Sequence, residues 1–590
     1  MKIDLKKSLF FLLILFSSIF FFYLGIQDKV ESIPVDASLG LLNVISFYWY
    51  LSLVISIILC VLCFFYFDLR WQFWLSIFLL VLILYGLPLF VETNPRSADT
   101  FWHMNSAFEI IHQEYLGFED GGSVGIKNEE DHRYSYLNTN PCVFMFFAVV
   151  LSLIGWETIN LIIFAKIFSL IAIILIILLI FLFFKALTKQ EKIAELSTFF
   201  CVLGNVYIQN HFSPQTIGLI LMLVIMLCFL KKEKIYRVCA MLLSLLVVFI
   251  HLPTALFLFL FGFVGLVLAY FLDLDLNFIK PLEVLTLFCF YAFYAVFFVE
   301  DIFSKIFTVL SENFILISLA LLILFFLGFM FKKYKLSQNK NLVNLLPLFG
   351  AIILFSLIYV SSFDWINIGR LLRYFVLLCS SSILVYLCYA FFKKRVFKEE
   401  EIIIFSFLVS ALVFFIFQFL MTSAFGLEDR SFLVYYLGFS CLVSLAILKH
   451  NILAKKAIFL MVILLLLNTV TIYYHENHYM ISSSDMSGWD YVYEISNTED
   501  LIFGNIDYYS MYYTGSYNEL TDIRYVDRYN LYESGEDLVY DYYVLNNFNA
   551  FSHYLYGDLE SYYTLVELIN NNSSYNQIYS SNGLSIIEKV

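Results

Sequence analysis

Long uninterrupted apolar runs constrain the fold of this chain more than any other feature of its sequence. A helix needs about 20 apolar residues to cross the hydrocarbon core of a bilayer. Runs of this kind recur through most of the chain, and 61% of its 590 residues are apolar while 14% are charged. We therefore predict an all-α polytopic membrane protein. Its fifteen spans are expected near 8–25, 44–66, 72–91, 159–184, 195–208, 213–230, 238–250, 253–271, 282–299, 314–331, 341–360, 373–392, 402–421, 431–448 and 457–474.

The charges of the connecting loops predict how these spans are oriented. Loops rich in Lys and Arg remain in the cytoplasm, and the sequence contains KALTKQEK, KKEKIYR, KKYKLSQNK, KKRVFK and KHNILAKK. Placing these loops inside gives a multi-pass protein of the cell membrane with a cytoplasmic N-terminus and an extracytoplasmic C-terminal tail. The count is consistent only if residues 141–155 do not cross the membrane. We predict a juxtamembrane or re-entrant helix there, and a true span with one misassigned loop is the alternative.

Composition divides the chain into three parts. Residues 1–71 form a transmembrane hairpin, whose first run lacks a convincing cleavage site and is interpreted as a helix rather than a signal peptide. Residues 72–475 form the main membrane domain, with a large outer loop at 92–158. The remaining part, 476–590, is acidic, because it contains 18 acidic and 3 basic residues.

The acidic tail is expected to be a small α/β domain. Residues 484–496 resemble a helix, and the apolar run near 501–503 resembles a strand. Two β-rich runs flank Asn582-Gly583, a pair that suits a tight hairpin turn. We therefore predict a terminal hairpin with Ile578 and Ile586 on its paired strands.

Two of the expected outer turns are alike. The segments NHFSPQ and IHLPTA each place a His before a Pro at the start of an apolar run, and Pro suits the first turn of a helix. The preceding runs, 195–208 and 238–250, are too short to span a bilayer fully. Such helices are tolerated where they line protein or water, so we expect a water-filled cavity near these turns. A chance similarity of two hairpins is the alternative.

The stretch VETNPRSADTFWHMN follows the third run and carries the strongest candidate for chemistry. Asp99 and His103 are four residues apart and would share one face of a helix. A partly desolvated carboxylate at this position can take a proton from a hydroxyl group, or orient that group. Asp99 can equally cap a helix that begins at Thr100.

The order of features around this acid resembles the GT-C superfamily of integral-membrane glycosyltransferases, which includes protein mannosyltransferases and aminoarabinose transferases. An acid early in the first large outer loop is followed by YLNTNP, a short apolar helix and GWETINLIIFAKIF. The resemblance implies that Asp99 is the catalytic base and that Tyr136 and Asn140 precede the juxtamembrane helix. It also implies that Lys166 is the basic residue at the outer end of the next span. The sequence has Asn-Thr-Asn-Pro where the family usually has a Tyr-Pro-Pro core, and it has two additional N-terminal spans, so the subfamily stays open.

This family moves a sugar from a polyprenyl-phosphate donor to an acceptor. The resemblance therefore implies that donor as a partner, a lipid, glycan or protein as the acceptor, and membrane lipids around both. The phosphate group needs cations at the outer boundary, where Arg370, Arg373 and Arg430 join Lys166 as candidates because Arg binds phosphate in a bidentate manner. Interfacial snorkelling is the alternative for each. The other substrate-binding candidates are Glu92, His103, Tyr136, Asn140, His211, Gln215 and His251.

Other classes of function find less support in the sequence. No DxD-type pair accompanies the acid, so no metal or other cofactor is expected, and a divalent metal is the alternative. No basic face is left for nucleic acid once the loops are explained by topology. The ten cysteines fall in or beside apolar runs and are expected to be buried thiols. Two rival functions stay open: a transporter or flippase of a lipid-linked saccharide, and a non-enzymatic membrane scaffold with a binding tail.

Overall fold

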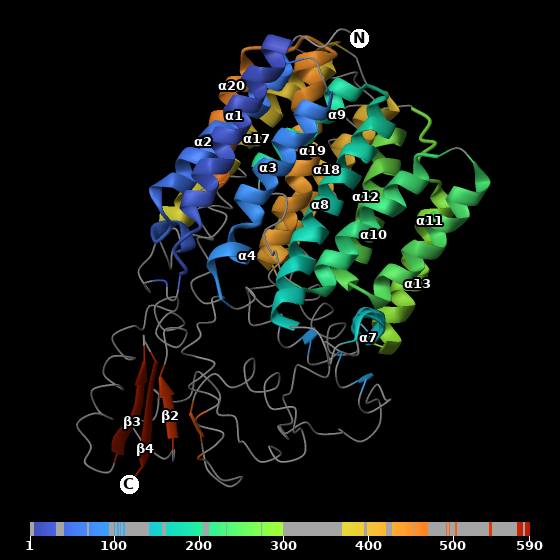
Figure 1. The fold of residues 1–590 in the computed structure, drawn as a ribbon. Helices are drawn as coiled ribbons and strands as arrows, with labels where there is room; N and C mark the ends of the chain where they lie inside the picture. The colour runs from blue at the N-terminus through green and yellow to red at the C-terminus, as the bar shows by residue number, and fades with distance from the viewer. Residues whose placement is uncertain are drawn as a thin grey trace.

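The protein is a bundle of helices with a small β-sheet beyond one end, as seen in a computed structural model (Figure 1). The structure describes residues 5–30, 33, 40–67, 70–93, 100, 103–104, 107, 110–111, 141–155, 161–204, 212–231, 233–272, 274–298, 368–394, 398–420, 427–453, 455–469, 491, 495, 502–503, 542–545, 575–581 and 584–589.

The helices begin and end close to the predicted apolar runs. They are α1 (Leu5–Gly25), α2 (Phe47–Phe65), α3 (Arg70–Tyr85), α4 (Leu87–Val91), α7 (Pro141–Ile154), α8 (Leu161–Thr188), α9 (Glu191–Leu203), α10 (Pro214–Phe229), α11 (Lys234–Leu246), α12 (Leu252–Phe271), α13 (Pro281–Phe298), α17 (Ile368–Lys394), α18 (Glu399–Leu420), α19 (Leu427–Leu448) and α20 (Ala457–Thr469), with two short 3-10 turns, η1 (Gly40–Asn43) and η2 (Val247–Phe249). Within the described residues, α1, α2, α12 and most of α8 are long and apolar enough to cross a membrane. The runs predicted at 314–331 and 341–360 lie outside the described residues, so the count of fifteen spans stays a prediction.

The single span predicted at 72–91 is two helices. α3 ends at Tyr85 and α4 begins at Leu87, with Gly86 between them. Pro88 stands in the first turn of α4 and has no N–H to continue the hydrogen bonds of α3. The apolar character of the run continues through this proline, so hydropathy alone predicts a single span.

The N-terminal hairpin is packed tightly against itself and the bundle. The hydroxyl groups of Ser18 and Ser52 donate to each other's main-chain carbonyl at 3.0 and 2.8 Å. A Cβ at Gly25 would lie 2.7 Å from the main-chain nitrogen of Trp49, so only glycine allows this approach of α1 to α2. Small residues permit such close packing in membranes. The indole N–H of Trp49 then donates to the carbonyl of Ile83 at 3.0 Å and ties the hairpin to α3.

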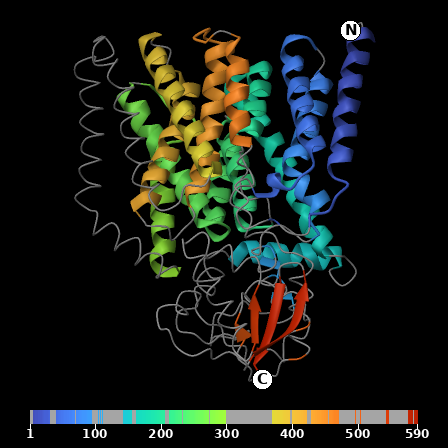
Figure 2. The same cartoon turned by 90° about the vertical axis from the view of Figure 1, so that its left-hand side faces the viewer.

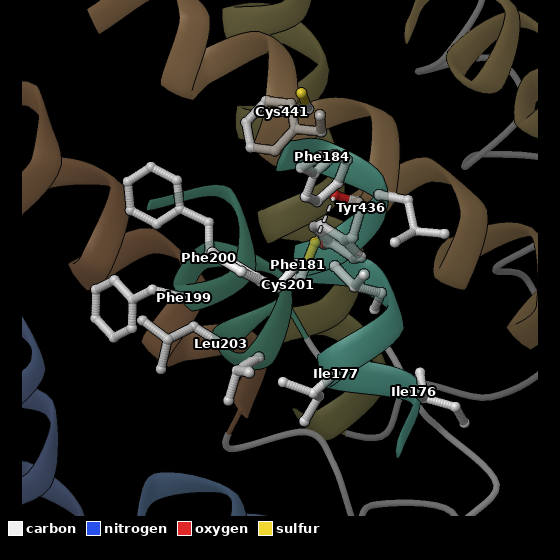
Figure 3. Packing of buried hydrophobic residues seen from close by; sticks show 14 of the residues in the cluster. Ile176, Ile177, Phe181, Phe184, Phe199, Phe200, Cys201, Leu203, Tyr436 and Cys441 are labelled. Atoms are coloured by element: carbon white, nitrogen blue, oxygen red, sulfur yellow. Dashed lines mark hydrogen bonds between the residues drawn. The ribbon is translucent and has the colours of Figure 1, made fainter. Parts of the chain in front are cut away.

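The centre of the bundle is the short helix α9, which is buried on all sides from Ile193 to Leu203. The phenylalanines of α9 pack against phenylalanines of α8 and residues of α19, as Figure 3 shows. The Cys201 thiol of α9 lies 3.8 Å from the Tyr436 carbonyl of α19. All ten cysteines are described and none forms a disulfide, so the prediction of free thiols is confirmed. Most are buried or half-buried, but Cys289 on α13 is exposed, contrary to the expectation of buried thiols, because it lies on an outward-facing side of that helix.

Helix α7 lies across the end of the bundle rather than along it (Figure 2). Its 14 residues rise about 21 Å, which is less than the roughly 30 Å core of a bilayer. That residues 141–155 do not cross the membrane stays a prediction. One face of α7 is buried in the protein, whereas Met145, Val149 and Leu153 are exposed on the other.

The C-terminal sheet contains β1 (Ile502–Phe503), β2 (Tyr542–Leu545), β3 (Tyr575–Ser581) and β4 (Leu584–Lys589), in the order β1-β2-β4-β3. β1 runs parallel to β2, and the other pairs are antiparallel. The strand expected near 501–503 and the terminal hairpin are confirmed, and residues 491 and 495 are helical. Ile578 and Ile586 lie on the paired strands β3 and β4, as predicted, and a register shift between Gln577 and Tyr579 makes Tyr579 the direct partner of Ile586. A one-residue bulge of this kind leaves no trace in the polar and apolar pattern.

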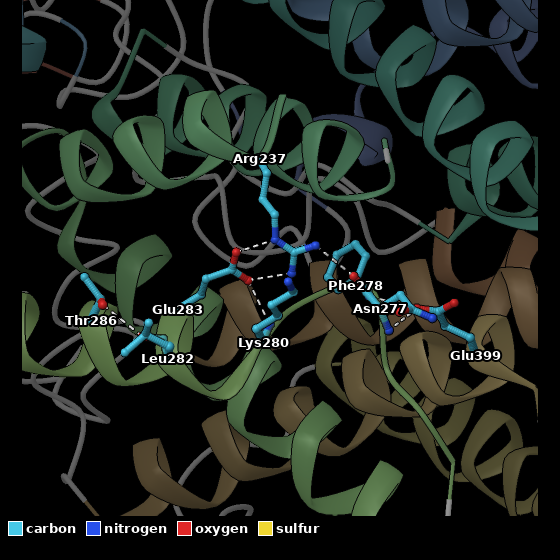
Figure 4. A network of polar contacts seen from close by, with 8 residues as sticks. All are labelled: Arg237, Asn277, Phe278, Lys280, Leu282, Glu283, Thr286 and Glu399. Atoms are coloured by element: carbon cyan, nitrogen blue, oxygen red, sulfur yellow. Dashed lines mark hydrogen bonds and ion pairs between the residues drawn. The ribbon is translucent and has the colours of Figure 1, made fainter. Parts of the chain in front are cut away.

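The sheet and the start of α1 lie at opposite ends of the bundle (Figures 1 and 2). A network of polar contacts surrounds the connection between α12 and α13 (Figure 4). There the Arg237 guanidinium donates to both carboxylate oxygens of Glu283 and, at 3.1 Å, to the Asn277 carbonyl. The Glu399 carboxylate accepts from two consecutive main-chain N–H groups, those of Asn277 and Phe278, at 2.6 and 2.8 Å. This network fixes the α12–α13 connection to α11 and α18.

Candidate functional site

An apolar layer under α7 joins the segments from which the candidate site is built. Val143, Phe144, Phe147, Ala148 and Leu151 of α7 are buried in this layer. Met104 and Ala107 of the outer loop reach it, as do Phe212 before α10 and Ile250 before α12. The rings of Phe147 and Phe212 are 3.7 Å apart at their centroids. The two turns that resemble each other in sequence therefore meet the outer loop at one place.

His103 lies within this layer and is only 3% exposed. Its Nδ1 lies 2.8 Å from the Phe212 carbonyl oxygen, which can only accept, so Nδ1 carries a proton and donates it. Burial lowers the pKa of His103 to about 3, and this hydrogen bond offsets part of the effect. The imidazole is therefore neutral at physiological pH. It links the outer loop to the turn before α10, and the predicted contact of His103 with substrate stays a prediction.

Lys166 lies in the second turn of α8, where a charge needs a reason. Its ammonium donates to the main-chain carbonyls of Glu92 at 2.5 Å and Thr93 at 3.4 Å. Glu92 itself is buried, with 2% of the residue exposed. Two of the predicted site residues are thus brought together at the point where the chain leaves α4.

The turns before α10 and α12 are packed against each other. Ser213 caps α10, with its hydroxyl oxygen accepting from the Thr216 N–H at 3.4 Å, and His251 stands at the cap position of α12. The Nδ1 atom of His251 lies 2.7 Å from the Thr254 hydroxyl. A Cβ added to Gly218 would meet the His251 Cβ and the Thr254 hydroxyl, each at 2.9 Å. The absence of a side chain at Gly218 allows the two helix starts to approach.

Gln215 is the least satisfied polar residue of this group. It stands in the first turn of α10, one turn before Gly218, and is 9% exposed. Its amide oxygen Oε1 is fully buried and has no hydrogen-bond partner within the part of the chain that the structure describes. Most buried polar atoms in folded proteins are paired, and leaving one unpaired costs about 1–3 kcal/mol. The position is therefore suited to a ligand that brings a hydrogen-bond donor.

Other predicted site residues are placed only in part. Asp99, Tyr136, Asn140 and His211 lie outside the described residues. Arg370 and Arg373 fall in the first turns of α17, and Arg430 falls in the first turn of α19, but the description covers the backbone of these residues and not their side chains. In the described part of the chain, no group of three or more His, Cys, Asp or Glu residues could hold a metal ion. The expectation that the protein needs no cofactor stays a prediction.

Sequence reasoning missed Lys29 and Gly218. The Lys29 ammonium donates to the Phe90 carbonyl beside Glu92. A signal was present, because Lys29 lies in a loop expected outside the cell, where lysine opposes the usual charge bias. Gly218 gave no comparable signal, since a lone glycine within an apolar run is ordinary in membrane helices.

Comparison with known protein families finds no matching family model, and a search of characterised proteins finds no match.

Proposed function

We propose that the chain is a membrane glycosyltransferase that moves a sugar from a polyprenyl-phosphate donor to an acceptor, at the membrane face where α7 lies. The observation that carries this proposal is the position of α7, which lies across the bundle end and packs on both hairpin turns and on the outer-loop segment of His103. A short apolar helix at this place is what the resemblance to GT-C transferases implies. A bundle of simple spans would leave this helix unexplained.

Three features support the chemistry. Asp99 follows Glu92 by seven residues in the sequence, directly after the segment that Lys166 binds. Lys166 donates two of its three ammonium protons to main-chain carbonyls, so one proton remains to offer a phosphate. Gln215 has an unpaired buried oxygen that a sugar hydroxyl could satisfy.

The reaction we propose is a single displacement with inversion. The Asp99 carboxylate takes the proton of the acceptor hydroxyl as its oxygen forms a bond to the anomeric carbon. The bond between that carbon and the phosphate oxygen breaks, and polyprenyl phosphate leaves with the electron pair. Lys166, with Arg370, Arg373 or Arg430, stabilises the negative charge of the leaving phosphate.

The test uses the purified protein in lipid nanodiscs with polyprenyl-phosphate-linked hexoses, and it measures release of polyprenyl phosphate. Asp99→Asn retains the size and capping ability of Asp, but we expect it to lower turnover by about 10²- to 10⁴-fold, the usual contribution of a positioned base. Lys166→Met should instead raise the donor KM. Asp275→Asn, at an exposed position in the α12–α13 connection, is the matched control and should leave turnover unchanged.

A transporter of lipid-linked saccharide would give a different result. It would move the intact lipid across the bilayer and release no polyprenyl phosphate. Wild-type turnover by Asp99→Asn would remove the role that we assign to this acid, even if sugar transfer itself were observed.

A further inference from the structure

Two lysines from distant parts of the chain meet on the short segment that ends α4. The Lys29 ammonium, from the loop after α1, donates to the Phe90 carbonyl. The Lys166 ammonium, from α8, donates to the carbonyls of Glu92 at 2.5 Å and Thr93 at 3.4 Å. Phe90 and Glu92 are two residues apart, so their Cα atoms are separated by at most about 7 Å. The two ammonium groups therefore lie at one place.

The main chain of the N-terminal hairpin holds Lys29 at this place. Val30 forms a parallel β-bridge with Glu92, and the Val30 N–H donates to the Val91 carbonyl at 2.9 Å. Val30 is buried, with 7% of the residue exposed. The bridge therefore fixes the hairpin to the end of α4 through the residue after Lys29, without using the Lys29 charge.

The two ammonium groups have more hydrogen-bond donors than the segment uses. An ammonium group has three protons. Lys29 gives one proton to a carbonyl and Lys166 gives two, so three protons remain between them. Lys29 is exposed and Lys166 is half-buried, so a ligand at the membrane surface can reach both. A phosphate monoester, with three acceptor oxygens and about two negative charges, matches these donors.

The surface of α8 beside Lys166 is apolar along its length. Ile167, Ile171 and Leu175 follow one another at four-residue spacing, so they share one face of the helix, and each is exposed. A lipid whose phosphate lies on the two lysines can place its chain against this face. A free phosphate would leave the face unused, so the arrangement favours a lipid-linked phosphate.

We propose that Lys29 and Lys166 together bind the phosphate group of polyprenyl phosphate, the leaving group of the proposed transfer. The identity of the lipid rests on the proposed function, whereas the phosphate site rests on the contacts of the two lysines. Lys29 belongs to the N-terminal hairpin, which the resemblance to GT-C transferases treats as an addition. The hairpin therefore supplies part of the binding site for the lipid.

The test measures the dissociation constant of polyprenyl phosphate for the full-length protein in nanodiscs, without sugar donor or acceptor, at low and high salt. Lys29→Met and Lys29→Arg are compared with the wild type and with Lys7→Met. Lys7 is a matched control, because its ammonium also donates to a main-chain carbonyl, that of Tyr66 at 3.0 Å, at the opposite end of the hairpin. The hydrogen-exchange rate of the Val30 amide is measured for each variant.

Lys29→Met should weaken binding about 10- to 100-fold at low salt, which is the usual contribution of a hydrogen bond to a charged group. The difference from the wild type should shrink at high salt, because ions screen an exposed charge. Lys29→Arg should recover most of the affinity, since a guanidinium retains both the charge and the donors. Lys7→Met should bind as the wild type does, and exchange at Val30 should be the same in all variants.

Wild-type affinity in Lys29→Met would overturn the proposal. Faster exchange at Val30 in Lys29→Met, with a loss of affinity that salt does not change, would overturn it in favour of a structural role for Lys29. Equal competition by inorganic phosphate or by phosphatidic acid would overturn the assignment to polyprenyl phosphate. A wild type that binds polyprenyl phosphate through Lys29 but transfers no sugar would refute the proposed function and leave the phosphate site in place.

Discussion

Replacing Gln215 by methionine should change the binding of the donor and the stability of the ligand-free protein in opposite directions. The two side chains are nearly equal in length, so Gln215→Met removes the amide from its buried site without opening a large cavity. The amide oxygen is fully buried and forms no hydrogen bond with the described residues, and Gln215 is 9% exposed. Removing an unsatisfied group of this kind should raise the free energy of unfolding by about 1–3 kcal/mol. We therefore expect a ligand-free variant that is more stable than the wild type and weaker in activity.

The assay is thermal unfolding in nanodiscs, with and without a polyprenyl-phosphate hexose. The donor should raise the Tm of the wild type by mass action and should raise that of Gln215→Met much less. Gln72→Met is a matched control, because the Gln72 amide nitrogen is likewise buried without a hydrogen-bond partner, on α3. This control should gain stability and retain the response to donor. A lower Tm for Gln215→Met, or an undiminished response to donor, would refute the reasoning.

Three further outcomes follow from the described contacts. Gly218→Ala should lower the free energy of unfolding by about 1–3 kcal/mol, because the added methyl group overlaps His251; chemical denaturation measures this. The pKa of His103 is lowered to about 3. The contribution of the neutral imidazole to the free energy of unfolding is therefore complete above pH 6.5 and decreases as the pH falls toward 3. By pH 5 the wild type should lose about 2 kcal/mol of this free energy relative to a His103→Asn variant. Arg237→Met should destabilise the protein more than the double variant that also carries Glu283→Met, because the single change leaves a half-buried carboxylate without its cation; a double-mutant cycle on Tm tests this.

The helices could be predicted from the sequence because each apolar run carries its own signal. α10 was expected at 213–230 and extends from Pro214 to Phe229, and α12 was expected at 253–271 and begins one residue earlier. Boundaries were less accurate where polar residues lie inside the bundle. α9 was expected at 195–208 but begins at Glu191 and ends at Leu203, because its first turn is charged and its burial comes from neighbouring helices.

The candidate site could be predicted only residue by residue. The sequence marks Lys166 because a charge inside a span is costly without a role, and it marks Gln215 and His251 because they could form hydrogen bonds with sugar hydroxyls. Their partners were beyond reach, since the contact of Lys166 with Glu92 joins positions 74 residues apart. The placement of His103 on the Phe212 carbonyl depends equally on how distant helices pack. Spacing within one helix carries no information about such contacts.

The order of strands in the C-terminal sheet has a consequence for biosynthesis. β4 lies between β2 and β3, although it follows both in the sequence. Its partners therefore leave the ribosome with unpaired edges, and exposed edges of this kind are prone to wrong pairing. If the sheet faces the outside of the cell, these edges also cross the membrane before β4 can join them. The tyrosine-rich strands β2 and β3 thus depend on a later segment for protection, and the interval between their translocation and the arrival of β4 is when the protein is most exposed to misassembly.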